Sequence, residues 1–108
     1  YIGDTIFRVA TLDLEDSLLH SVMKLTSEKY RDSDVYERIN MVEMYKGKKD
    51  LDSLSSDLEI NIRIYHGDDM EEISQDFKDT INLLKCKDGS FEPLVFIEND
   101  EVSYTFKI

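Results

Sequence analysis

The chain has 108 residues, with 13 Lys and Arg against 24 Asp and Glu, a formal net charge of −11. This length fits one domain with its own core, so we expect residues 1–108 to form a single domain. The acidic balance argues against nucleic-acid binding, which needs a basic footprint, and against docking on anionic membranes.

Cys86 is the one cysteine in the sequence, so an internal disulfide and a multi-cysteine zinc site are excluded. A single thiol is typical of a reducing compartment, so we expect an intracellular protein. The sequence contains no apolar run long enough to span a bilayer, and no signal-peptide pattern opens it.

The N-terminal part of the chain predicts a strand and then a helix. Residues 5–10 are β-prone and predict a short strand. Residues 14–26 carry apolar side chains at helical spacing, which predicts an amphipathic helix. Asp13 is the expected N-cap of this helix, and Asp16 lies in its first turn, where a negative charge favours the helix dipole.

A second helix is expected over residues 35–46, after a connection at residues 30–32. Asp34 and Glu37 have the spacing of a capping box at its start, and Gly47 supplies a stop at its end. Its expected apolar stripe consists of Val35, Ile39 and Val42. A further short helix is expected after Asp50, which would cap it.

The apolar period changes from helical to alternating near residue 58. Met70, Ile73 and Phe77 keep a helical spacing, which predicts a short helix or turn there. Asp88-Gly89 predicts a two-residue type I′ hairpin turn. The expected strands are residues 59–65, 80–86, 91–98 and 101–107. Helices followed by such strands predict an α+β fold, with two main helices and a mainly antiparallel sheet of four or five strands.

Two segments resemble those that characterise ovarian-tumour (OTU) type cysteine proteases, in the diverged form of large DNA viruses. Residues 15–21 (EDSLLHS) resemble the segment that carries the nucleophile at the start of a buried helix. Residues 90–94 (SFEPL) resemble the strand that begins with the catalytic histidine. The resemblance spans roughly residues 13–98 and places Ser17 at the cysteine position and Ser90 at the histidine position.

The resemblance therefore implies the fold without its inherited chemistry, which pairs a thiolate with an imidazole. We expect a non-catalytic domain, with degenerate positions Ser17 and Ser90, that needs no cofactor or metal. Its expected role is protein–protein interaction or viral assembly, in the host cytoplasm or the virion, with a homo-oligomer as one form. The alternatives are a regulatory module that binds ubiquitin or a host factor, and a deubiquitinase-related protein with residual activity.

Other side chains that could carry chemistry are weaker candidates. Ser17 and His20 are three apart on the first helix, but neighbours on one helix rarely form a hydrolase triad with an acid such as Asp16. His66 precedes an acidic run whose spacing does not match a calcium loop, so a solvated loop is the preferred interpretation. That run contains Asp68, Asp69, Glu71 and Glu72.

Cys86 is expected to pack rather than react, because only Lys85 and Lys87 beside it are basic. The tyrosines and phenylalanines fit either an interface patch or the core. The candidates are Tyr30, Tyr36, Tyr45, Tyr65, Tyr104, Phe91 and Phe96.

Overall fold

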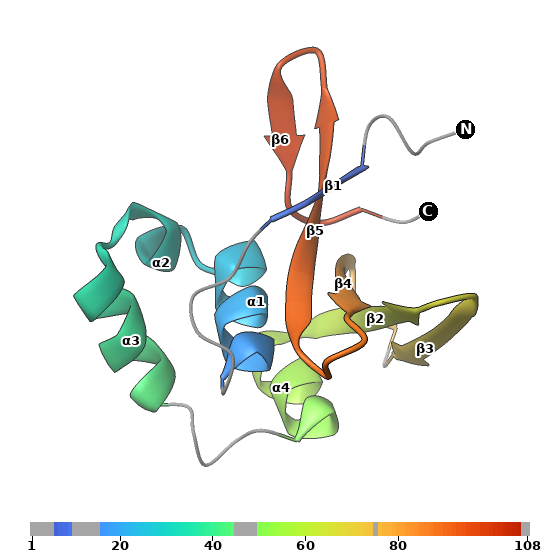
Figure 1. Cartoon of the computed structure of the whole chain (residues 1–108), viewed down its shortest axis with the longest axis horizontal. Coiled ribbons are helices and arrows are strands. Elements are labelled where there is room, and N and C mark those ends of the chain that lie inside the picture. Colours follow the sequence, from blue (N-terminus) through green and yellow to red (C-terminus); the bar gives the residue numbers. More distant parts are fainter. Residues whose placement is uncertain (1–5, 10–15, 45–49, 75, 107–108) are drawn as a thin grey trace.

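The structure is a computed structural model that describes residues 6–9, 16–44, 50–74 and 76–106. Within these ranges the fold is α+β, as the sequence predicts, with the helices gathered on one side of a single sheet (Figure 1). The helices are α1 (Ser17–Thr26), α2 (Glu28–Asp32), α3 (Val35–Glu43) and α4 (Leu51–Leu58). The strands are β1 (Ile6–Arg8), β2 (Ile60–His66), β3 (Asp69–Ile73), β4 (Asp79–Lys85), β5 (Phe91–Glu98) and β6 (Glu101–Ser103).

The strands follow the order β1-β5-β4-β2-β3, and β6 pairs with the far part of β5. Each recorded pair is antiparallel except β2 with β4, which run parallel. The expected mainly antiparallel sheet is confirmed, but a simple meander over all strands is not. After β2 the chain forms β3 on the outer side of β2 and then returns to lie along the other side as β4.

The main core lies between the helices and one face of the sheet. Ile62 and Ile64 of β2 are paired with Ile81 and Leu83 of β4, and all four side chains are buried. Leu19, Val22 and Leu25 of α1 are buried on the helical side, where α1 contacts β4 and β5. Burying an aliphatic side chain of this size contributes about 1.5–3 kcal/mol relative to exposure. This core fixes the first turn of α1 beside the start of β5.

The other face of the sheet is also covered, which the alternating pattern did not predict. Asn61, Thr80 and Asn82 are buried there. Asn61 donates from Nδ2 to the Phe77 carbonyl at 2.8 Å, and Asn82 donates from Nδ2 to the Phe106 carbonyl at 2.6 Å. These polar side chains are tolerated inside the protein because their hydrogen-bonding groups have partners.

The helical part differs from the prediction in its number of helices and their bounds. The expected connection at residues 30–32 is wrong, because the chain forms α2 there, capped by Ser27 Oγ, which accepts from the Tyr30 amide at 3.1 Å. Asp16 occupies the cap position of α1, and residues 13–15 lie outside the described ranges. The Asp34 cap of α3 is confirmed, since its Oδ1 accepts from the Glu37 amide at 2.9 Å. Gly47, the expected stop after this helix, falls outside the described residues.

Three predictions in the strand region are wrong. Met70 and Ile73 of the expected short helix or turn lie instead in β3, an edge strand that pairs with β2 after a turn with Gly67 at φ +61°. At Asp88-Gly89 only Gly89 has a positive φ, so that turn is not type I′. The type I′ signature occurs between β5 and β6, where Asn99 and Asp100 have φ of +53° and +66°. Strand β6 ends at Ser103, because the chain then crosses to hydrogen-bond with β4.

Candidate functional site

The two segments that resemble the protease motifs meet in the structure, although they are 74 residues apart in the chain. Ser17, the first residue of α1, accepts through Oγ a hydrogen bond from the backbone amide of Phe91, the first residue of β5, at 2.9 Å. One turn further along α1, Ser21 donates from Oγ to the Phe91 carbonyl at 3.1 Å. Both polar backbone groups of Phe91 are therefore satisfied by side chains of α1.

The Ser17 side chain lies inside this contact, since Ser17 is only 3% exposed. An attacking hydroxyl needs a base within hydrogen-bond reach and access to a substrate carbonyl. His20 is also buried, and its Nδ1 lies 2.6 Å from the Tyr30 hydroxyl. The structure thus places the His20 ring against Tyr30, and Ser17 against the Phe91 amide, so a Ser17–His20 hydrolase pair has no support from the geometry.

Ser90, at the second matched position, stabilises the turn between β4 and β5. Its hydroxyl donates to Asp88 Oδ1 at 2.6 Å, and its backbone amide donates to the same oxygen at 2.9 Å. These hydrogen bonds from Ser90 hold the pKa of the Asp88 carboxyl below its ordinary value of 3.8. Cys86 completes the turn, because its amide donates to the Ser90 carbonyl at 2.8 Å.

The remaining sequence candidates do not converge on a site. Of the acidic run after His66, Asp68 lies in a turn, and the other three residues lie in the exposed edge strand β3 rather than in a loop, where Glu72 pairs with Arg63. Among the described residues, no group of three or more His, Cys, Asp or Glu side chains is arranged to hold a metal ion. Cys86 is half-buried at the end of β4, with Arg8 Nη2 3.9 Å from its sulfur.

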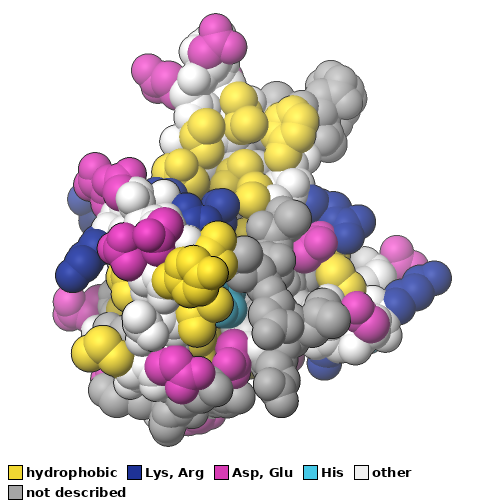
Figure 2. Space-filling model, turned by 60° about the vertical axis from the view of Figure 1, so that its left-hand side comes forward, with side chains coloured by type: hydrophobic (Ala, Val, Ile, Leu, Met, Phe, Trp, Pro, Cys, Tyr) yellow, Lys and Arg dark blue, Asp and Glu magenta, His cyan; other side chains and the backbone are white. Residues whose placement is uncertain are grey.

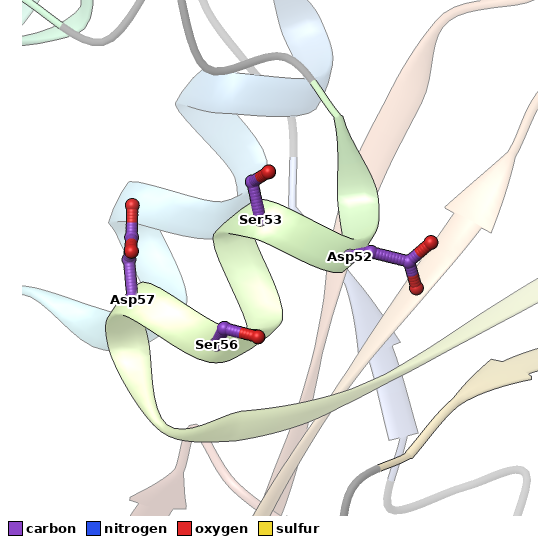
Figure 3. Close-up of a pocket in the computed structure, with 4 residues that line it drawn as sticks. All are labelled: Asp52, Ser53, Ser56 and Asp57. Carbon is purple, nitrogen blue, oxygen red and sulfur yellow. The ribbon is translucent and has the colours of Figure 1, made fainter.

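A hollow of about 400 Å³ lies over the outer surface of α4. Asp52, Ser53, Ser56 and Asp57 line it, and Figure 3 shows their side chains pointing in different directions from one helix. Side chains that diverge in this way cannot hold one reacting group between them, so this hollow is no candidate active site.

The aromatic side chains divide between the core and the surface. Tyr30 is 2% exposed and belongs to the core, whereas Tyr36 on α3 is 80% exposed. Tyr65 and Tyr104, with Phe91 and Phe96, are intermediate, and Tyr45 lies outside the described residues. Two neighbours of Tyr36 on α3 are exposed as well, Val35 at 48% and Ile39 at 41%. Only Val42 of the expected stripe on this helix is buried, so that interpretation of α3 is corrected.

Comparison with solved structures identifies the class of fold. The structure is similar to the OTU domain of OTUD1, with a TM-score of 0.52 and 14% sequence identity, over 82% of this chain and 85% of that one. No family model matches the sequence, and no curated protein matches it. The chain therefore has an OTU-like fold, and at this identity the similarity concerns the fold alone. Within the described residues, no helix is long and apolar enough to cross a membrane.

Proposed function

We propose that this chain is a non-catalytic OTU-like domain that acts by binding another protein. The observation that carries the first half of the proposal is the contact between Ser17 and Phe91. A hydroxyl stands where the resemblance places the thiol, and it is buried and accepts a backbone amide. In that position it joins helix to strand and is not free to attack a substrate.

The second matched position supports the same proposal. A serine nucleophile would need a base to take its proton, and Ser90 has no group with a suitable pKa. Its hydroxyl donates instead to Asp88 within the same turn. The two matched positions thus serve the folded structure, one at a helix–strand contact and the other in a turn.

The second half of the proposal rests on the exposed apolar residues of α3, Val35, Tyr36 and Ile39, which we call the α3 patch. Figure 2, with the helical side turned forward, shows hydrophobic side chains gathered on this side of the molecule beside acidic ones. Tyrosine favours interfaces because it joins a large apolar body to a polar tip. The α3 patch is therefore the surface that we assign to the partner.

Charge decides what kind of partner fits. Asp34, Glu37 and Glu43 on and beside α3 are exposed carboxylates, whereas Arg38 is turned inward, donating to the carbonyls of Tyr30 and Arg31. With a net charge of −11, two copies of the chain repel each other. A partner with an apolar centre and basic flanks would complement both features. A binding role through such a partner is favoured over self-assembly.

An activity assay tests the non-catalytic half. Ubiquitin chains and a fluorogenic ubiquitin substrate, incubated with the protein, are expected to show no turnover above buffer. The matched variant is Ser17→Ala, which should give the same baseline. Turnover that this variant abolishes would refute the pseudoenzyme proposal, because the hydroxyl would then be acting as a nucleophile.

A pull-down from the native context, followed by affinity measurement with the purified partner, tests the binding half. The variant Val35→Ser/Tyr36→Ser/Ile39→Ser should lower the affinity for the partner at least about 30-fold, which is the usual loss when hot-spot residues are truncated. Met70→Ser/Val102→Ser is the matched control, because both residues are exposed apolar side chains on other elements. Equal loss in both variants, or a partner that binds the α3 variant unchanged, contradicts the patch assignment.

Two further outcomes decide between the classes of partner. Ubiquitin that shifts the NMR signals of α3 during a titration would support the regulatory ubiquitin-binding alternative. If light scattering shows a dimer of the unmodified protein and a monomer of the α3 variant, the protein self-assembles through α3, and the argument from charge repulsion is overturned. A monomer that recovers no protein partner from its native context would refute the binding role.

A further inference from the structure

A second feature of the structure lies away from α3, at the edge of the sheet formed by β3. In the sheet order β3 is the last strand, and among the described residues it pairs with β2 alone. Figure 1 shows β3 on the side of the molecule opposite to α3, with no described helix or strand beyond it. The backbone N–H and C=O groups of β3 that point away from β2 therefore have no strand partner.

The geometry of this edge is suited to pairing with a further strand. The register between β2 and β3 is continuous over all five residues of β3, without a bulge. Strand β3 contains no proline, and four of its five residues are exposed. Proteins commonly protect an edge with a bulge, a proline, a covering element or charged side chains. Of these devices, the described part of the chain shows only charge at β3.

The charge at this edge has one sign. Residues 68–79 contain six carboxylates and one lysine, which is a net charge of −5 out of the −11 of the chain. Glu72 is paired with Arg63 of β2. Asp69 and Glu71 form no ion pair within the described residues. Such an edge repels a second copy of itself, because two rows of carboxylates would face each other, but it attracts a strand of opposite charge.

The side chains of β3 alternate between the two faces of the sheet, and this alternation specifies a partner strand. Asp69 and Glu71 lie on one face, which is the face of Ile64, the register partner of Glu71. Met70 lies on the other face beside its register partner Tyr65 and is 48% exposed. A strand laid along β3 in register would place basic side chains beside Asp69 and Glu71 and an apolar side chain beside Met70.

We infer that the edge of β3 binds an extended segment of a partner protein in which basic residues alternate with apolar ones. In this mode of recognition, main-chain hydrogen bonds to the sheet edge provide affinity, and the alternating side chains provide specificity. The inference does not depend on the proposed binding role of α3, because the two surfaces share no residue and lie on opposite sides of the molecule (Figure 1).

An NMR titration of the protein with a capped peptide of alternating lysine and valine, as long as β3, tests the inference. We expect shifts of the β3 amide signals that saturate, and slower hydrogen exchange at the β3 amides that point away from β2, because the peptide covers them. Spermidine, a trication without peptide groups, is the control for charge and should leave this exchange unchanged. Absence of saturable shifts on β3, or the same slowing of exchange by spermidine, overturns the inference.

The variant Asp69→Asn/Glu71→Gln tests the role of the two carboxylates and leaves the backbone of β3 intact. Loss of two exposed charge pairs should lower the affinity for the peptide about threefold to tenfold. Glu98→Gln/Asp100→Asn is the matched control, with the same change of net charge at exposed carboxylates of the β5–β6 turn. Unchanged affinity in the first variant, or equal loss in both, would contradict the assignment of the basic residues.

Methylation of the peptide backbone separates strand pairing from charge attraction. In a strand, the amides of alternate residues point to the same edge, so methylation of the lysine amides and methylation of the valine amides block opposite edges of the peptide. We expect one methylated peptide to lose affinity at least about tenfold, since its hydrogen bonds to β3 are removed, and the other to lose less than about threefold. Equal affinities of the two methylated peptides would refute pairing with the edge of β3.

Discussion

Replacing Tyr30 by alanine is expected to lower the free energy of unfolding by about 3–5 kcal/mol, the usual cost of removing a buried aromatic side chain. Tyr30 is among the largest fully buried side chains of the protein, with 2% of its surface exposed. It lies in α2, between α1, whose His20 it contacts, and α3, whose Arg38 lies 5.0 Å from its ring centre. Its loss would leave a cavity at the junction of three helices.

Tyr30→Phe separates the hydroxyl from the ring. The phenol lies 2.6 Å from Nδ1 of the buried His20, so its removal should cost about 1–3 kcal/mol, the usual penalty for a buried polar group that loses a partner. Tyr36→Ala and Tyr36→Phe are matched controls at 80% exposure and should change stability by no more than about 0.5 kcal/mol. Urea unfolding of the four variants measures this, and equal effects at the two positions would contradict the placement of Tyr30.

Alkaline pH provides a second measurement on the same side chain. Burial raises the pKa of Tyr30 above its ordinary value of 10.0, and the nearby Arg38 opposes part of this rise. A folded-state pKa above the unfolded value means that the contribution is present below pH 10 and is lost as the pH rises through the folded-state pKa. The stability difference between the protein and Tyr30→Phe should therefore shrink above pH 10. A difference that stays constant to higher pH would contradict the burial argument.

The parts of the fold that the sequence predicts well are those whose apolar pattern encodes one buried face. Strand β5 has the predicted bounds, and β2 and β4 differ from their predicted bounds by one residue at each end. The wrong assignments are short elements that depend on partners elsewhere. Strand β3 carries mostly acidic residues and forms because it pairs with β2. Helix α2 depends on the Ser27 cap and on the burial of Tyr30.

In the candidate site, too, the sequence predicts some features, and others depend on tertiary packing. The resemblance places Ser17 and Ser90 at matched positions, and the contact of Ser17 with Phe91 agrees with the meeting of these segments. No local pattern could have predicted which hydroxyl accepts which amide, since this depends on the packing of α1 on β5. On α3, apolar spacing groups Val35 and Ile39 with Val42, but spacing does not determine which part of an apolar stripe the fold covers. The exposed α3 patch is likewise a product of tertiary structure.

The second large effect is expected at Asn82, which attaches the C-terminal segment to the sheet. Asn82 is fully buried in β4. Its Nδ2 donates to the Phe106 carbonyl at 2.6 Å, and its Oδ1 accepts from the Tyr65 hydroxyl at 3.3 Å. The Phe106 amide donates to the Thr80 carbonyl at 3.0 Å, so the segment is held at two points on the same strand.

Asn82→Leu keeps the side-chain volume but removes both hydrogen bonds. The Phe106 carbonyl and the Tyr65 hydroxyl then lose their partner. At about 1–3 kcal/mol for each such group, we expect a loss of about 2–4 kcal/mol in unfolding free energy, with the weaker Tyr65 bond contributing less. Asn40→Leu is the control, because Asn40 is an exposed residue of α3 and should change stability by no more than about 0.5 kcal/mol.

Amide hydrogen exchange distinguishes local from global loss in the Asn82 variant. The Phe106 amide should exchange faster than in the unmodified protein by more than the change in global stability accounts for, because its segment is released from β4. The stacking of Arg31 on Tyr104, 3.8 Å from the ring centre, should weaken with it, because Tyr104 belongs to the same segment. A variant as stable as the parent, with the Phe106 amide still protected, would show that the segment is held by the stacking of Phe106 on Phe96 and not by Asn82.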